Sequence, residues 1–277
     1  MPVGELCAQA EWQDGPTFRL VVLFHRHLDV LERTLPRCVE ALTAGTRQSF
    51  EVVLHCDGSP LDVARMVLDR QGAWGVDEVR LRSRDRHVAS GDPSNNGHRR
   101  LLDCRCRYVI VIEDDVLLFR QEASFDPLTV LRELFEQQPD VPVVCALDDS
   151  ADWVWALTDV GSRIAPGVRS VNRVATHMIA YDVERFLPAA DRYGAFDLDV
   201  FVDRDDCSYN WEDLVSHVGT TGGRRIAWPE AWPLRAFHCD RKVAPGSMCN
   251  TQDPRVKIAV IDYLEAEFGQ ARPESRS

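Results

Sequence analysis

Residues 108–116 read YVIVIEDDV, an unbroken apolar run that ends in three consecutive acids. The β-branched residues predict a strand over Tyr108–Ile112, and the lack of any polar interruption predicts that both of its faces are buried at the centre of a sheet. Carboxylates crowded at a strand end repel one another unless a cation or a proton neutralises them. We therefore expect Glu113, Asp114 and Asp115 to bind a divalent metal ion; a solvated acidic turn is the alternative.

The sequence on either side of this stretch alternates short apolar runs with helical periodicity. Strands are predicted at Phe18–Phe24, Glu51–His55, Val76–Leu81, Val141–Leu147 and Arg173–Tyr181. Helices are predicted at Val30–Leu42, Leu61–Gln71, Asn95–Cys104 and Asp253–Phe268. Strands that alternate with helices favour a parallel sheet joined by right-handed crossovers. The fold class we expect is therefore α/β, with a mixed, mostly parallel sheet flanked by helices.

Polar side chains follow three of the predicted strands at the point where each strand ends. His25 follows the first strand, Asp57 the second, and Glu113 begins the acidic trio after the strand at Tyr108–Ile112. Parallel strands end at one edge of a sheet, and ligands bind outside the carboxyl ends of such strands. The sequence therefore predicts that these groups share one ligand site.

Length and composition are those of an ordinary globular protein. It has 277 residues, 45% of them hydrophobic, and a formal net charge of -12. An acidic surface argues against binding of a nucleic-acid backbone. We expect one domain over 16–269, with two functional halves. The ends, 1–15 and 270–277, are expected to be flexible.

The nine cysteines are scattered and form no CxxC pair, which argues against a zinc ribbon. Most lie within apolar stretches, where free cysteine packs as a small hydrophobe, and a reducing cytoplasm fits this usage. The longest apolar runs, Leu20–Phe24 and Tyr108–Ile112, are too short to cross a bilayer. We expect a cytoplasmic protein without a transmembrane segment, with peripheral membrane contact left open.

Three segments together resemble the nucleotide-binding half of GT-A glycosyltransferases of the family 2 type. They are FRLVVLFHRH (18–27), EVVLHCDGSP (51–60) and YVIVIEDDV (108–116). The Glu-Asp-Asp form of the metal motif resembles that of inverting N-acetylglucosaminyltransferases. The resemblance covers roughly residues 18–120 and implies a GT-A (Rossmann-like) fold. It also implies a nucleotide-sugar-binding half at 16–120 and an acceptor-binding and catalytic half at 121–269. The donor would be a nucleotide-diphosphate sugar, and the cofactor Mn²⁺ or Mg²⁺.

The resemblance also implies roles for individual residues. His25 would lie at the donor pocket, and Asp57 would contact the base or ribose. Asp115 would be the main metal ligand, with Glu113 and Asp114 supporting the sugar, the ribose or the metal ligands. The segment 95–100 stands where family members carry a helix that contacts the donor, which makes Asn96 and Arg99 candidate donor contacts. His238 stands where several families carry a late histidine ligand to the metal; a packed or surface histidine is the alternative.

The segment Asn210-Trp211-Glu212-Asp213 resembles the acidic motif that begins a helix near the acceptor in many inverting GT-A enzymes. The resemblance makes Asp213 the base that deprotonates the acceptor, with Glu212 as the alternative. Acids at a helix start can also serve only to stabilise the helix. Tryptophans that could form an acceptor platform, or simply pack in the core, are Trp153, Trp155, Trp228 and Trp232.

These features predict an inverting, metal-dependent glycosyltransferase. It would use a UDP- or dTDP-type sugar and a hydroxyl or amine of a glycan or small-molecule acceptor. Two other readings remain open. A nucleotidyltransferase would use the same kind of sheet but should carry a glycine-rich loop after the first strand, and 25–29 contains no glycine. A non-catalytic nucleotide- or sugar-binding protein would not need Asp213.

Overall fold

A computed structural model describes residues 15–57, 59–82, 106–146, 160–174, 177–191, 211–239 and 253–269. The predicted helix at Asn95–Cys104, the donor candidates Asn96 and Arg99, and Trp153 and Trp155 lie outside these residues. None of the helices in the described ranges combines the length and the apolar character that crossing a bilayer requires.

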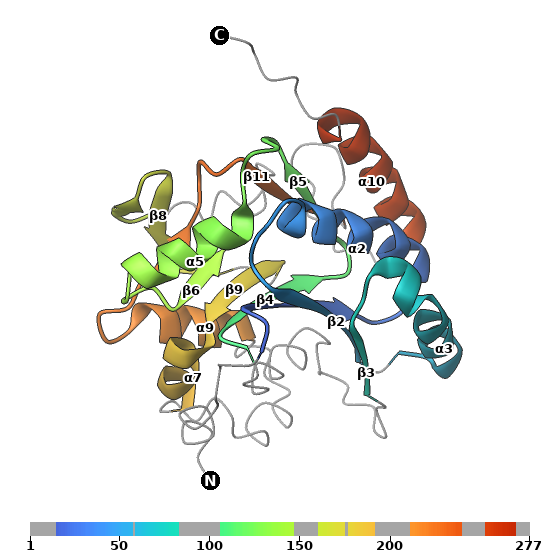
Figure 1. The fold of residues 1–277 in the computed structure, drawn as a ribbon, viewed down its shortest axis with the longest axis horizontal. Coiled ribbons are helices and arrows are strands. Elements are labelled where there is room, and N and C mark those ends of the chain that lie inside the picture. Colours follow the sequence, from blue (N-terminus) through green and yellow to red (C-terminus); the bar gives the residue numbers. More distant parts are fainter. Residues whose placement is uncertain are drawn as a thin grey trace.

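The described residues form a nine-stranded mixed sheet with the strand order β3-β2-β1-β4-β9-β6-β10-β8-β7 (Figure 1). Its strands are β1 Phe18–Phe24, β2 Phe50–Asp57, β3 Glu78–Arg82, β4 Tyr108–Glu113, β6 Val143–Cys145, β7 Arg163–Ala165, β8 Val168–Val171, β9 Met178–Asp182 and β10 Ile226–Trp228. The first four strands along the chain are parallel to one another, as predicted, whereas β9 pairs antiparallel with both β4 and β6. The mixed α/β class is therefore confirmed.

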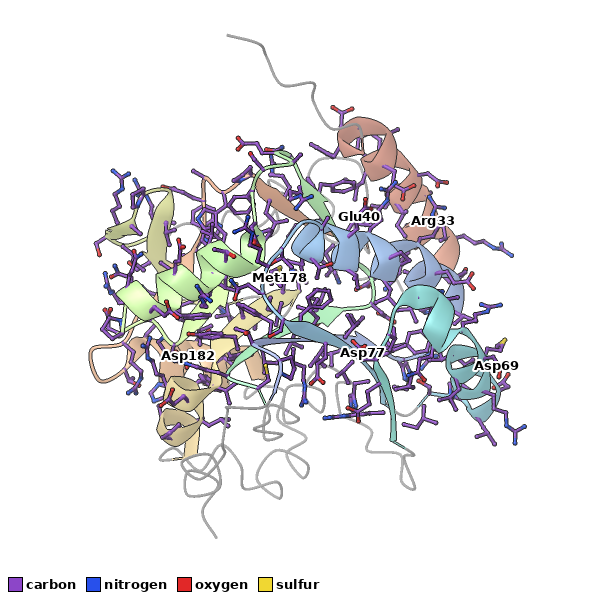
Figure 2. All side chains as sticks on the ribbon, in the orientation of Figure 1. Arg33, Glu40, Asp69, Asp77, Met178 and Asp182 are labelled. Atoms are coloured by element: carbon purple, nitrogen blue, oxygen red, sulfur yellow. The ribbon has the colours of Figure 1, made fainter. Side chains whose placement is uncertain are left out.

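The central position of β4 is confirmed. Alternate side chains of this strand enter the two hydrophobic layers on opposite faces of the sheet, and the residues from Tyr108 to Ile112 are at most 2% exposed. Its neighbour β9 runs antiparallel to it, from Met178 near the centre of the molecule to Asp182, which lies farther from the centre (Figure 2). The carboxyl end of β4 therefore lies beside the beginning of β9.

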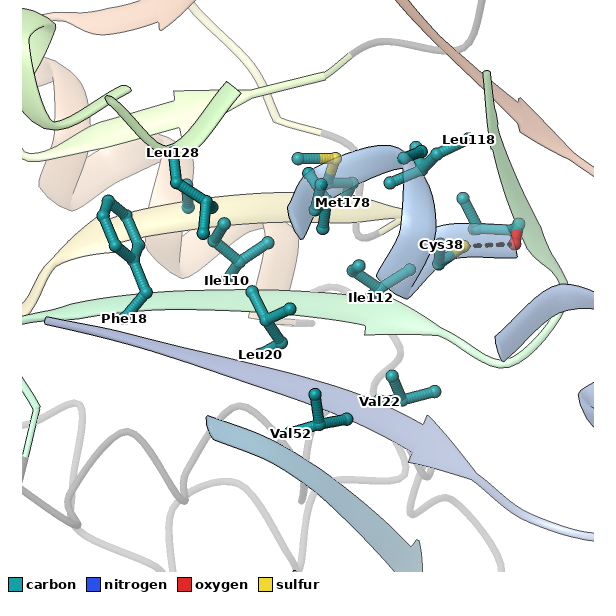
Figure 3. Close-up of a cluster of buried hydrophobic side chains, with 14 of the residues drawn as sticks. Phe18, Leu20, Val22, Cys38, Val52, Ile110, Ile112, Leu118, Leu128 and Met178 are labelled. Carbon is teal, nitrogen blue, oxygen red and sulfur yellow. Dashed lines mark hydrogen bonds between the residues drawn. The ribbon is translucent and has the colours of Figure 1, made fainter. Parts of the chain in front are cut away.

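Helices cover both faces of the sheet (Figure 1). On one face α2 (Leu28–Thr43) and α5 (Pro127–Gln137) pack over the layer that contains Phe18, Leu20 and Ile110 (Figure 3). On the other face lie α7 (Val183–Asp191) and α9 (Trp211–Thr220). At the edge beyond β2, α3 (Leu61–Arg70) and a short 3-10 helix, η2 (Gln71–Trp74), lead into β3.

A second, two-stranded sheet starts at the acidic turn. It pairs β5 (Val116–Arg120) antiparallel with β11 (Leu234–His238), so that Val116 faces His238. Behind this sheet, α10 (Pro254–Phe268) packs through Val260, Ile261 and Leu264. The turn at 114–115 is thus the junction between the large sheet and the small one.

Most predicted elements in the described ranges are found, β1 with the predicted ends and the others with shifted ends. Prediction fails for the start of the strand expected at Arg173–Tyr181, because β9 begins only at Met178. The backbone N–H of Val174 donates to the Ser216 hydroxyl of α9 (3.1 Å) rather than to a neighbouring strand. His177 consequently lies in a turn just before the strand, and its position matters for the site.

Candidate metal centre

Four side chains from distant parts of the sequence meet at the junction of the two sheets. The pairing of Ile112 with Met178 places Glu113 across from His177, and the Glu113 N–H donates to the His177 carbonyl (3.2 Å). On the other side, the Cys239 N–H donates to the carbonyl of Asp115 (2.8 Å), which brings the end of β11 with His238 against the acidic turn. Backbone pairing, rather than side-chain contacts alone, therefore positions the cluster.

Three of these side chains, those of Glu113, His177 and His238, are close enough to share one ion, and Asp115 contacts His238 beside them. His238 Nε2 lies 3.3 Å from Glu113 Oε2 and 3.0 Å from Asp115 Oδ1. Glu113, His177 and His238 each offer a ligand atom, and these atoms lie within 4.8 Å of one another. The two imidazole rings stack, with centroids 4.1 Å apart. All four side chains are buried or nearly so.

These distances fit a divalent cation. Ligand atoms about 2.1 Å from one ion lie about 3.0–4.2 Å apart, which is within the 4.8 Å that limits the separations among the ligand atoms of Glu113, His177 and His238. Carboxylate oxygens suit Mg²⁺, Ca²⁺ and Mn²⁺, whereas imidazole nitrogens suit first-row transition ions. Two histidines beside one carboxylate are therefore compatible with a divalent transition ion such as Mn²⁺.

A lysine shares the cluster. Lys257 of α10 is 4% exposed, and its ammonium group pairs with Oδ2 of Asp115. Burial on its own would raise the pKa of Asp115, but His238 and Lys257 beside the carboxylate hold that pKa well below its usual range. The other carboxylate oxygen of Asp115, Oδ1, faces His238, which is one of the candidate ligands. The Asp115 carboxylate is thus held as an anion, with Oδ2 toward Lys257 and Oδ1 toward His238.

Asp114 differs from its neighbours. Its carboxylate accepts a weak hydrogen bond from the His25 N–H (3.4 Å), and its carbonyl accepts one from the Thr34 hydroxyl. Burial and the negative charge of Asp115 raise the pKa of Asp114 to about 8. The raised pKa favours the protonated carboxyl in the absence of a cation, and a proton there lowers the repulsion within the trio.

The remaining predicted residues divide into two groups. The sheet brings the carboxyl ends of β1, β2 and β4 to one edge, with Leu23 beside Glu113 and Phe24 beside Cys56, so His25 and the backbone of Asp57 lie on that edge. Glu212 and Asp213 fall in the first turn of α9, where a helix start is predicted. The side chains of Asp57, Glu212 and Asp213 lie outside the described residues.

Two members of the cluster, His177 and Lys257, are missing from the sequence prediction. His177 directly precedes the apolar run Met178–Tyr181, a signal similar to that of an acid after a strand, but only the antiparallel pairing with β4 shows its relevance. Lys257 lies on the same helical face as Val260, Ile261 and Leu264. A lysine on the apolar face of a helix is a sign that a buried partner exists.

No protein-family model matches this chain, and neither does any curated protein. Among solved structures it is similar to a mannosyltransferase, PcManGT from Pyrobaculum calidifontis, in complex with GDP-Man and Mn²⁺ (14% identity, TM-score 0.49), covering 87% of this chain and 64% of that one. It is also similar to TarS of S. aureus (12% identity, TM-score 0.47), covering 93% of this chain and 40% of that one. A TarS 1–349 complex with UDP-GlcNAc shows 13% identity and a TM-score of 0.49, covering 93% of this chain and 68% of that one. Similarity this distant assigns no family, so any function rests on the chemistry of the metal centre.

Proposed function

We propose that this chain is a metal-dependent inverting glycosyltransferase that moves a sugar from a nucleotide-diphosphate donor to an acceptor hydroxyl or amine. The observation that carries the proposal is the convergence of Glu113, His177 and His238 at the carboxyl end of β4, with Asp115 in contact with His238. This end lies on the same sheet edge as the ends of β1 and β2, which is where open α/β sheets bind nucleotides.

Glu113, His177 and His238, with Asp115 proposed as a further ligand, would hold Mn²⁺ or Mg²⁺, and the two imidazoles favour Mn²⁺. When bound, the ion would neutralise the diphosphate and so stabilise it as a leaving group. Lys257 keeps Asp115 ionised and limits its rotation, because one carboxylate oxygen is held by the ammonium group. Backbone pairing holds Glu113 and His177 in register.

The donor would extend from the metal along the sheet edge. Asp57, at the end of β2, would contact the base or ribose, and His25 and Asp114 would lie near the diphosphate or sugar. Asn96 and Arg99 are proposed as further donor contacts. A UDP- or dTDP-type donor is the proposal for this chain; the similar structures carry GDP-Man in one case and UDP-GlcNAc in another.

The acceptor would be deprotonated by Asp213, with Glu212 as the alternative. A carboxylate base of this kind accelerates proton transfer by about 10²–10⁴-fold when it lies within hydrogen-bond reach of the attacking group. Its place in the first turn of α9 is compatible with an ionised acid, because the helix dipole stabilises negative charge there. The acceptor is proposed to be a glycan or small molecule.

The test is sugar-nucleotide turnover by the purified chain with Mn²⁺, with Mg²⁺ and with EDTA, scored as release of free nucleotide with and without candidate acceptors. We expect turnover that requires the metal and falls at least a hundredfold in His238→Ala. The matched control is His217→Ala, which removes an exposed imidazole near the end of α9 and should leave turnover unchanged. Equal turnover in EDTA, or an active His238→Ala variant, would contradict the proposal.

A further inference from the structure

The acidic turn contributes fewer carboxylates to the candidate metal centre than its sequence indicates. Among the described residues, the ligand atoms that lie within 4.8 Å of one another come from Glu113, His177 and His238, so one carboxylate meets two imidazoles. Asp114 accepts a backbone N–H just after β1, and Asp115 pairs through Oδ2 with a lysine of α10. Even with Asp115 as the further ligand proposed above, half of the donor atoms would be nitrogens.

His177 is the residue that changes the donor set, and backbone hydrogen bonds hold it from two sides. Its carbonyl accepts from the Glu113 N–H (3.2 Å), and the carbonyl of Met178, the next residue, accepts from the Ala146 N–H (3.2 Å). Its ring stacks on that of His238, with centroids 4.1 Å apart. The imidazole is thus held beside the other candidate ligands by contacts that do not involve an ion.

Such a donor set suits Zn²⁺ better than Mg²⁺ or Mn²⁺. Carboxylate and water oxygens suit Mg²⁺ and Mn²⁺, whereas imidazole nitrogens suit Zn²⁺. Two histidines and one glutamate form the ligand set of some catalytic zinc sites. Mg²⁺ usually keeps several of its waters. His177 is only 6% exposed, and the side chains of His238 and Glu113 are 11% and 19% exposed, which limits the access of water to the centre.

We propose that His177 sets the metal selectivity of this centre, so that the chain binds Zn²⁺ more tightly than Mn²⁺ and zinc displaces manganese from it. Zn²⁺ exceeds Mn²⁺ in affinity for most nitrogen and oxygen sites, and the second imidazole should widen this difference. The effect on activity rests on the glycosyltransferase function above. A four-coordinate Zn²⁺ held by three side chains has one position left for the donor diphosphate, whereas a six-coordinate Mn²⁺ has three. Zinc is therefore expected to inhibit manganese-dependent transfer.

The test measures the binding of the metal ions alone to the full chain, without nucleotide. Mn²⁺ binding is followed by loss of the free-ion electron paramagnetic resonance signal, and Zn²⁺ binding by competition with a chromogenic chelator. We expect a lower dissociation constant for Zn²⁺ than for Mn²⁺, and release of bound Mn²⁺ as Zn²⁺ is added. In the turnover assay, saturating Zn²⁺ should stop the transfer. Tighter binding of Mn²⁺ than of Zn²⁺, or full turnover with zinc bound, would overturn the proposal.

The variant His177→Asp replaces the imidazole by a carboxylate at the same position. Loss of a residue that only orients a metal ligand already costs about 10–100-fold in affinity, so the exchange of a direct ligand should lower the preference for Zn²⁺ over Mn²⁺ at least about tenfold. The matched control, His217→Asp, makes the same change at an exposed residue of α9 and should keep the wild-type preference. An unchanged preference in His177→Asp would overturn the proposal.

Thermal unfolding without metal guards against misfolding, because His177→Asp places a second carboxylate beside Glu113. If that variant is destabilised, His177→Asn replaces it, since the amide offers an uncharged oxygen ligand and should lower the zinc preference in the same way. The two proposals fail separately. A zinc preference that depends on His177, without any sugar transfer, would leave the role of His177 standing and contradict the enzyme. Manganese-dependent transfer by a chain without this preference would do the reverse.

Discussion

Replacing Lys257 by methionine tests whether its ammonium group is the counter-charge of the metal centre. The variant keeps the apolar stem of the side chain but leaves Asp115, which is 6% exposed, with His238 as its remaining ion-pair partner among the described residues. Removing one partner of a buried ion pair costs about 3–5 kcal/mol, because the other charge stays buried and uncompensated. Because the contact between His238 and Asp115 remains, we expect the lower end of this range, about 3 kcal/mol.

In a chain of this size about 3 kcal/mol corresponds to a fall in melting temperature of about 6–12 °C. The assay is thermal unfolding followed by circular dichroism in EDTA and then in Mn²⁺. An ion at 100 times its dissociation constant stabilises the wild type by about 2.7 kcal/mol. It should stabilise Lys257→Met by more, because it also replaces the missing positive charge beside Asp115.

The control for this prediction is Arg33→Met, which breaks ion pairs between α2 and α10 at the protein surface (Figure 2). Exposed pairs contribute at most about 1 kcal/mol, so this variant should lose little and respond to Mn²⁺ as the wild type does. The reasoning is refuted if Lys257→Met loses no more stability than Arg33→Met, or if Mn²⁺ raises the melting temperature of both variants equally.

Three further predictions concern the base, the acidic turn and the thiols. Asp213→Asn should lower kcat by about 10²–10⁴-fold and leave donor affinity unchanged, and a variant that turns over normally would remove Asp213 from the mechanism. Because the pKa of Asp114 is raised to about 8 against about 3.9 when unfolded, the metal-free protein should lose stability as the pH rises from about 4 to about 8, by at most about 1.4 kcal/mol per pH unit. Urea unfolding at several pH values should show that the unfolding free energy of Asp114→Asn changes less with pH than that of the wild type. An identical pH dependence in the two proteins would contradict the assignment. Burial raises the pKa of Cys38, Cys56 and Cys106 to about 12, so peptide mapping after brief alkylation of the native protein should find all three unlabelled; labelling of any of them would show that the thiol is accessible.

The elements that could be predicted from the sequence are those whose pattern is local. The strand at Phe18–Phe24 is found with the predicted ends, and the unbroken apolar run before Glu113 does form a doubly buried central strand. Asp253, the first residue of the predicted closing helix, caps α10 by accepting from the Arg255 N–H (2.9 Å). In each of these cases neighbouring residues along the chain contain the whole signal.

Several short strands of the second half could not be predicted, although β6 at Val143–Cys145 lies within the predicted strand Val141–Leu147. Three-residue strands such as Arg163–Ala165 and Ile226–Trp228 have too few residues to show a period, and they form only because neighbouring strands pair with them. The small sheet of β5 and β11 joins segments more than 100 residues apart, and neither strand was predicted.

The candidate site shows the same division. Glu113, Asp114, Asp115 and His238 could be selected from the sequence because acids after a buried strand and a late histidine are visible there. His177 depends on the antiparallel register of β9 against β4, and Lys257 on a contact across 142 residues. A single sequence contains no record of either pairing. The prediction therefore includes His238, one ion-pair partner of Asp115, but not Lys257, the other.

The most direct test of the central claim is the affinity of the chain for Mn²⁺, measured by the loss of the free-ion electron paramagnetic resonance signal on titration with UDP present. We predict one site per chain in the wild type. The affinity should fall at least tenfold in His177→Ala and in His238→Ala, and should be unchanged in His217→Ala. No bound manganese, or equal affinity in all four proteins, would contradict the account.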